Sequence, residues 1–203
     1  MYKTKSKGVS KEFCDQVFND INQIVRECSE KFGIPMGMRC FQYSIATEEY
    51  LNTIFKKRVA VINAGTCYWR CVLPENDDGI INTHYGFKFD IKNAFDSMVK
   101  ENFNKIEMHC WTAAILNDER YCIDLSTGHL MQRAISEGYT WEGIEPPKYL
   151  FTTEEKVIEI CNDGLAFYQS NRDAIRITEI FRQSECANRV TLLSKLAAFT
   201  KRT

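Results

Sequence analysis

The chain has 203 residues, 44% of them hydrophobic and 26% charged, which is typical of one sizeable globular domain and unlike disordered or repetitive chains. The 26 Lys and Arg residues nearly balance the 27 Asp and Glu residues, so the net charge is -1 and gives no general attraction to nucleic acids or acidic membranes. We therefore expect a single domain over residues 1–203, with residues 1–9 as a flexible tail and without a nucleic-acid or membrane partner.

The start of the chain and its cysteines indicate the cellular compartment. Residues 2–10 are polar and lack the run of roughly 7 to 15 apolar residues that a secretory signal needs. The cysteines number nine, an odd count, so we expect reduced thiols and a cytoplasmic protein rather than a disulfide framework. Their spacing contains no Cys-x-x-Cys pair, so we expect no structural metal and no cofactor.

The first third of the chain predicts two helices. Apolar residues recur at helical spacing over residues 11–32, and Gly33 and Pro35 follow as stop signals. A second helix is predicted over residues 48–57, with Thr47 as its N-cap. The apolar run 59–62 fits either a strand or a loop.

Strands and helices alternate in the remainder. Residues 85–89 have the alternation of a strand, and residues 90–103 the spacing of a helix. Residues 105–116 and 120–125 predict two strands joined by a polar turn at residues 117–120. Helices are predicted over residues 130–137, 154–169 and 173–199, the second with a capping box formed by Thr152 and Glu155. The expected fold class is α+β, with a small antiparallel sheet and several packed helices.

A glycine-containing turn precedes Cys67, in the segment Gly65-Thr66-Cys67, and an apolar segment follows it. We expect Cys67 to begin a helix, where unpaired N–H groups and the helix dipole lower the pKa of a thiol from its usual value of about 8.5. This position is suited to a nucleophilic thiolate.

A thiolate nucleophile needs a base, and His109 has the best context of the three histidines. It lies on a predicted strand with Trp111 on the same face, where the indole can cover the imidazole. Asp124 on the partner strand is the candidate that orients the imidazole. A two-residue turn places Asp124 opposite Trp111 and diagonal to His109, whereas a four-residue turn places it opposite Ala113 and out of reach.

These segments together resemble the transglutaminase-like branch of the papain-fold cysteine enzymes, in the order Gly65-x-Cys67-Tyr68, His109-x-Trp111 and Asp124-x-Ser126-Thr127. The resemblance covers about sixty residues. It implies a papain-like fold, a catalytic triad of Cys67, His109 and Asp124, and a cysteine hydrolase or acyltransferase acting on a peptide, protein or small amide substrate.

The sequence departs from that family at two places. Ala113 stands where an acidic residue often follows the His-x-Trp motif, and no upstream glutamine matches the donor of the papain oxyanion hole. Asn63 is the candidate substitute for that donor. Trp111, Trp69 and His84 are the other candidates for contacts with substrate.

Three alternatives remain open from the sequence. Cys71 lies one helical turn beyond Cys67 and is a second candidate nucleophile. The chain can also be an inactive relative that binds a peptide or a protein partner, or a zinc protein with His and Cys ligands.

Overall fold

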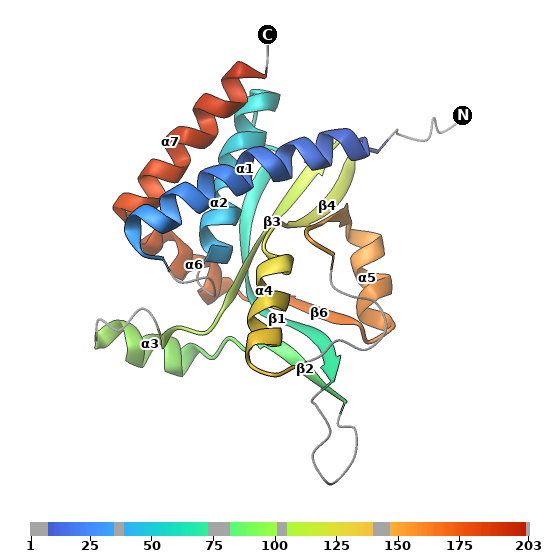
Figure 1. Ribbon diagram of the computed structural model, residues 1–203, viewed down its shortest axis with the longest axis vertical. Coiled ribbons are helices and arrows are strands. Elements are labelled where there is room, and N and C mark those ends of the chain that lie inside the picture. The colour runs from blue at the N-terminus through green and yellow to red at the C-terminus, as the bar shows by residue number, and fades with distance from the viewer. Residues whose placement is uncertain (1–7, 35–38, 73–81, 101–104, 140–146, 202–203) are drawn as a thin grey trace.

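The computed structural model describes residues 8–34, 39–72, 82–100, 105–139 and 147–201 (Figure 1). Its strands are β1 (Ala60–Val72), β2 (Asn82–Phe87), β3 (His109–Leu116), β4 (Glu119–Asp124), β5 (Leu150–Thr153) and β6 (Ala166–Ser170). Its helices are α1 (Lys11–Phe32), α2 (Arg39–Phe55), α3 (Ile91–Val99), α4 (Thr127–Ser136), α5 (Glu154–Asn162), α6 (Arg172–Phe181) and α7 (Glu185–Thr200). The described residues therefore form an α+β fold, as the sequence predicts.

The strands form one antiparallel sheet in the order β2-β1-β3-β4-β5, and β6 also pairs with β1. Strand β1 is long enough to pair with three others, β2, β3 and β6. Gly86 on β2 lies so close to β1 that a Cβ atom there would be 1.9 Å from the carbonyl oxygen of Cys67. Only glycine fits this approach without moving the strands apart.

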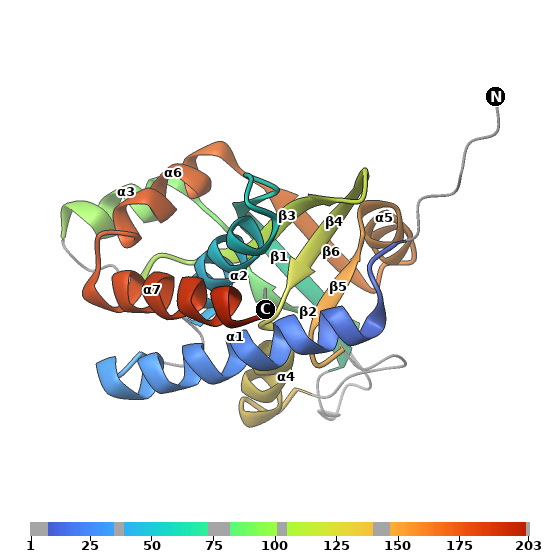
Figure 2. The same ribbon diagram turned by 90° about the horizontal axis from the view of Figure 1, so that it is seen from above.

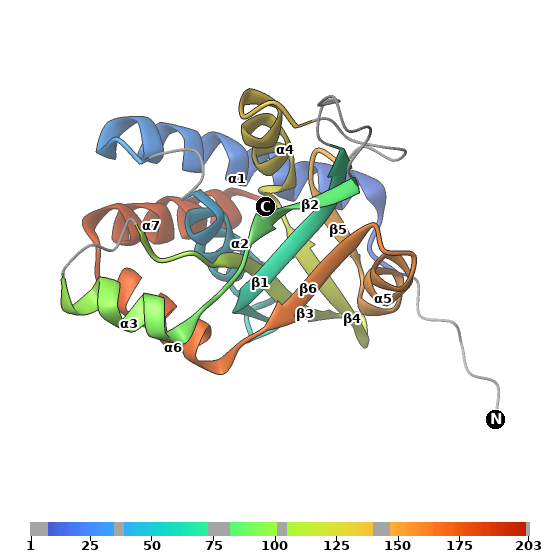
Figure 3. The same cartoon turned by 90° about the horizontal axis from the view of Figure 1, so that it is seen from below.

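Helices α1, α2 and α7 pack together on one face of the sheet, with α2 lying against β1 and β3 (Figures 1 and 2). Helix α5 packs beside the sheet away from these three helices (Figure 3). Alternate residues of β3 face the two layers: Cys110 and Ala114 belong to the core under α2, whereas Trp111 packs with Val157 of α5. The sheet thus separates two apolar clusters.

Two local predictions are confirmed. Helix α1 covers residues 11–32, with Ser10 as its N-cap and Gly33 in the left-handed conformation at its end. The predicted hairpin of β3 and β4 is also present, and of the two turns that the sequence leaves open it has the two-residue one, because Leu116 pairs with Glu119 and both residues between them have positive φ. This is the register that brings Asp124 within reach of His109.

Other local predictions were wrong. The second helix begins at Arg39, not near residue 48, and Thr47 lies inside it with its hydroxyl bonded to the carbonyl of Tyr43. Residues 154–169 form a helix and then a strand, and residues 173–199 form two helices. Strand β5 was not predicted, and the N-cap of α5 is Thr153 rather than Thr152.

Two further observations concern the chain as a whole. The expected tail at residues 1–9 lies mostly outside the described residues, but the backbone N–H of Val9 donates to the hydroxyl of Tyr121, so Val9 is attached to the sheet. In the described ranges, no helix combines the length and the apolar character that crossing a bilayer requires.

Candidate active site

His109 and Asp124 form a buried pair at the same end of β3 and β4. His109 Nε2 lies 2.6 Å from Asp124 Oδ2, and each side chain is at most 2% exposed. Burial alone would lower the pKa of His109, but the charge and hydrogen bond of Asp124, together with Cys40, raise it to about 10. Such a pair holds the imidazole in one orientation and stabilises its protonated form.

The Asp124 carboxylate is fully bonded on both oxygens. Oδ1 accepts from the backbone N–H and the hydroxyl of Ser126, and Oδ2 accepts from the hydroxyl of Tyr168 at 2.9 Å as well as from His109. Burial would raise the pKa of this carboxyl, but the His109 charge and these hydrogen bonds keep it below its ordinary value. Asp124 is therefore ionised although it is buried.

Aromatic side chains enclose the His109 ring. Phe87 of β2 is stacked on it with centroids 5.9 Å apart and planes 7° apart, and Trp111 is stacked at 6.3 Å. Tyr168 of β6 meets the ring edge-on at 6.4 Å. These contacts restrict the imidazole and exclude water from the His109–Asp124 bond, which strengthens it.

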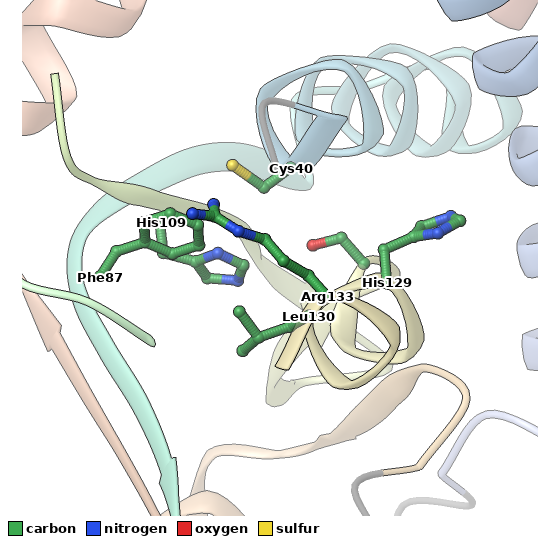
Figure 4. Close-up of a pocket in the computed structure, with 7 residues that line it drawn as sticks. Cys40, Phe87, His109, His129, Leu130 and Arg133 are labelled. Carbon is green, nitrogen blue, oxygen red and sulfur yellow. The ribbon is translucent and has the colours of Figure 1, made fainter. Parts of the chain in front are cut away.

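The sulfur that meets His109 from the helix side belongs to Cys40. Cys40 is the second residue of α2 as the structure describes this helix, and Figure 4 shows it across a small cavity from His109. His109 Nδ1, the ring nitrogen that does not bond Asp124, is buried and has no partner of full hydrogen-bond geometry in the described ranges. Cys40 nevertheless lies close enough to His109 that each residue shifts the pKa of the other. Catalytic hydrogen bonds are often this loose before substrate binds.

Cys40 is the thiol that most easily becomes a thiolate. A hydrogen bond from the Cys110 thiol, and the hydrogen bond and charge of His109, outweigh burial and hold the pKa of Cys40 well below its ordinary value. The pKa of Cys110 is raised in turn, by its bond to Cys40 and by burial. Of the two thiols, Cys40 is the one beside the imidazolium and in the first turn of a helix, so its ionised form is the more favoured.

Cys67 has a different environment from the one that the sequence suggests. The expectation that it begins a helix was wrong, because it lies within β1, paired with Phe87 on one side and with Tyr168 on the other. It is 0% exposed, and burial and the negative charge of Asp124 raise its pKa well above the ordinary value. Its sulfur still lies within 4.8 Å of ligand atoms of His109 and Asp124, so the three predicted residues do converge.

Access also distinguishes the two cysteines. Cys40 lines both the small cavity, of about 10 Å³, and an adjoining large cleft of about 1140 Å³. Cys67 lines neither of them. The large cleft runs between the start of α2, β2, residues 105–108, α4 and α6, and its size suits a peptide or a ligand of comparable size. A substrate in the cleft therefore reaches the sulfur of Cys40.

The remaining predicted site residues lie at different distances from this cleft. His84 is exposed and lines it, whereas Trp111 reaches the site only through its stack on His109. Trp69 is buried and donates to the Tyr168 hydroxyl at 3.2 Å. Asn63 lies on β1 and its side chain accepts from the backbone of Ala64.

One residue that the sequence reasoning did not select also lines the large cleft. Gln42 lines the large cleft, is 6% exposed, and within the described part of the chain its buried Oε1 has no hydrogen-bond partner. A buried acceptor of this kind is costly unless a ligand pairs with it, so Gln42 is a candidate contact for a substrate N–H group. Cys71, the second candidate nucleophile, is 0% exposed on β1, where burial raises its pKa.

Cys40 carries a sequence signal that is visible in retrospect. Gly33, Pro35 and Gly37 interrupt the helical pattern, and Cys40 follows them at the start of an apolar run. The residues of α2 from Cys40 to Glu48 are all buried, so polar residues do not gather on a solvent-exposed face and the sequence shows no amphipathic period there.

The three residues that the sequence predicts as a triad also have side chains of the kinds that bind metal ions. Cys67, His109 and Asp124 offer three ligand atoms within 4.8 Å of one another. However, His109 Nε2 and Asp124 Oδ2 are bonded directly to each other, and zinc in proteins takes four ligands or three and a water. The geometry therefore fits a hydrogen-bonded dyad better than a metal centre.

Comparison with known proteins does not assign this chain to a family. No protein-family model matches the sequence, and no curated protein matches it. One solved structure, described only as that of a structural genomics target, aligns with 14% identity over 88% of this chain and 77% of its own. The TM-score of 0.42 is too low to assign a fold family or an activity from it.

Proposed function

We propose that this protein is a cysteine-dependent hydrolase or acyltransferase of the papain-like type, acting on a peptide or amide acyl group, with Cys40 as its nucleophile. The observation that carries the proposal is the row of three side chains at the end of the cleft. Cys40 lies in the first turn of α2 beside His109, and His109 bonds the buried carboxylate of Asp124 at 2.6 Å. This order of thiol, imidazole and carboxylate is the arrangement that nucleophilic acyl transfer requires.

The roles follow from the chemistry of each group. The Cys40 thiolate attacks the acyl carbon, and the carbonyl electrons move onto oxygen, where backbone N–H groups of the first turn of α2 can bind them. Collapse of this intermediate expels the amine, which takes a proton from the His109 imidazolium, and leaves a thioester on Cys40. His109 then removes a proton from water or from an acceptor amine, whose attack on the thioester releases the acid or a new amide.

The proposal changes the nucleophile that the sequence suggests and keeps the other two residues. Cys67 is enclosed on β1, has a raised pKa and lines neither the small cavity nor the large cleft among the described residues. Cys40 is 8% exposed and lies at the cleft. In this proposal, Cys67 lies beside the triad, and Cys40 is the residue that attacks the substrate.

The test is labelling with limiting iodoacetamide at pH 7, followed by peptide mass spectrometry of all nine cysteines. We expect alkylation to concentrate on Cys40, to disappear from that peptide in Cys40→Ala, and to slow at least about tenfold in His109→Ala, because the imidazolium no longer supports the thiolate. Cys67→Ala is the matched control and should leave labelling of Cys40 unchanged.

The same experiment separates the alternatives. Preferential labelling of Cys67 that survives Cys40→Ala would restore Cys67 as the nucleophile and refute the assignment of Cys40. A zinc centre at Cys67, His109 and Asp124 predicts a stoichiometric metal in the purified protein and a labelling pattern that changes on chelation. Reactivity no faster at Cys40 than at an ordinary thiol would favour a binding module that has lost catalysis.

A further inference from the structure

Arg133 of α4 lines both the small cavity and the large cleft, and it brings a permanent positive charge next to the proposed nucleophile. Figure 4 shows its side chain extending from α4 toward Cys40 and His109. The small cavity, bounded by Cys40, His109 and Arg133 among others, holds about one water-sized group. A group bound there contacts the thiol, the imidazole and the guanidinium together.

Two neighbours fix the guanidinium. Arg133 Nε lies 3.0 Å from a carboxylate oxygen of Glu137 on the next turn, and the guanidinium carbon lies 5.4 Å from the centre of the Phe87 ring. Phe87 is itself stacked on His109, so Arg133, Phe87 and His109 form one stack. Because Nε bonds Glu137, the two terminal NH₂ groups are the donors that a ligand can use in a forked arrangement.

We propose that Arg133 selects substrates that carry a carboxylate close to the reacting acyl carbon, by binding that carboxylate where the small cavity meets the large cleft. This inference rests on the proposed function, since it assigns a substrate class to the same site. The geometry favours an anion because the planar fork of guanidinium donors matches the two oxygens of a carboxylate. Glu137 orients the fork from the far side without occupying the cavity, since Glu137 lines only the large cleft.

The test compares two alkylating reagents of nearly equal shape, iodoacetate and iodoacetamide, which differ in the carboxylate. The rate constant of each at Cys40 is measured by mass spectrometry in the wild type, Arg133→Gln, Arg133→Lys and Lys105→Gln. Lys105 is the matched control because it is a cation of the large cleft that does not line the small cavity. The imidazolium of His109 attracts iodoacetate in every variant, so the ratio of the two rates isolates the contribution of the mutated side chain.

We expect Arg133→Gln to lower the iodoacetate-to-iodoacetamide ratio about five- to tenfold, as loss of a charge contact at a partly exposed site predicts. Arg133→Lys should keep part of the ratio, and Lys105→Gln should keep nearly all of it. The ratio in the wild type should fall as salt is raised, whereas that of Arg133→Gln should depend less on salt. Arg133 and Glu137 are 40% and 44% exposed, so the variants should fold, which circular dichroism checks.

The outcomes distinguish this inference from the proposed function. A ratio that is the same in Arg133→Gln and the wild type, with Cys40 still the reactive thiol, overturns the role of Arg133 and leaves it a support for Phe87. Slow reaction of Cys40 with both reagents in the wild type overturns the proposed function itself. If Arg133→Gln and Lys105→Gln lower the iodoacetate-to-iodoacetamide ratio equally, the preference for iodoacetate comes from the summed positive charge around the cleft. That result would also contradict a specific contact between Arg133 and a carboxylate.

Discussion

At the scale of single residues, the site depends on how the charge of Asp124 is transmitted to a sulfur that it does not touch. Asp124 is on β4 and Cys40 is on α2, and His109 lies between them: its Nε2 bonds Asp124, whereas its Nδ1 has no hydrogen-bond partner in the described ranges. The carboxylate raises the pKa of His109, and the resulting imidazolium helps to lower the pKa of Cys40. A change at Asp124 should therefore appear in the titration of Cys40.

We expect Asp124→Asn to move the pH dependence of Cys40 alkylation upward. In the wild type, the rate with iodoacetamide should reach its plateau at a lower pH than that of an ordinary thiol, because the pKa of Cys40 is held well below its ordinary value. Without the carboxylate the pKa of His109 falls, the imidazolium is lost near neutrality, and the midpoint should approach the value of about 8.5 of an ordinary thiol. Rate measurements from pH 4 to 9 check this.

The matched control for this change is Asp118→Asn at the hairpin turn, where the aspartate is exposed and has a positive φ that asparagine tolerates. It should leave the profile unchanged. A midpoint that is identical in Asp124→Asn and the wild type would show that Asp124 does not control the thiol, and would contradict the proposed triad.

The sequence brings His109 and Asp124 close together in one of the two registers that it leaves open, but it does not point to Cys40. The first two lie on consecutive strands joined by a two-residue turn, so local register arithmetic decides their distance. The third comes from α2, about seventy residues earlier, and is brought to them by the packing of α2 against β1 and β3. Spacing along the chain contains no information on such a contact, so the glycine-flanked Cys67 was chosen instead.

At the scale of elements, the sequence-based prediction failed for the helical segment that has no solvent-exposed face. The amphipathic helix α1 was predicted with its correct ends, whereas only the last part of α2, which is buried on all sides over its first half, was recognised. The predicted helix at residues 154–169 failed for another reason. Gly164, with φ of 67°, ends α5, and the alternating segment Ala166–Ser170 pairs with β1.

The contact of β1 with β2 places Phe87 on the His109 ring, and Gly86 permits that contact. We expect Gly86→Ala to lower the free energy of unfolding by about 2 kcal/mol or more, since its Cβ would meet the backbone of Cys67 and Tyr68. It should also slow alkylation of Cys40, because Phe87 moves away from the imidazole. Urea unfolding and the labelling assay measure the two effects.

His84→Ala is the control on the same strand, since His84 is exposed and its loss should change the unfolding free energy by no more than about 0.5 kcal/mol. Full stability and normal labelling of Gly86→Ala would contradict the view that the close approach of β2 is required for the site.

At the scale of the whole molecule, α2 is the element that joins the helical layer to the sheet and also carries Cys40. Its first turn meets His109, its middle packs under β3, where the Thr112 hydroxyl donates to the carbonyl of Ser44, and its far half bonds the C-terminal helices. Arg182, just after α6, makes ion pairs with Glu48 and Glu49 of α2 and with Glu179. The helix that carries the proposed nucleophile is thus also held by a charge cluster at some distance from Cys40.

We expect Arg182→Gln to destabilise the protein more at pH 8 than at pH 5. Glu48 is 7% exposed, and burial raises its pKa although Arg182 opposes this. Without Arg182 the pKa rises further, so folding requires either a buried unpaired carboxylate or uptake of a proton. A group whose pKa is higher in the folded state loses stability as pH rises and recovers it as pH falls. The loss should be about 3 kcal/mol at pH 8 and clearly smaller at pH 5 in urea unfolding.

Arg176→Gln, which removes an exposed pair with Asp173, is the control and should cost less than about 1 kcal/mol at either pH. An Arg182→Gln loss that is the same at both pH values would mean that Glu48 is not the group left uncompensated, and that Arg182 acts through packing.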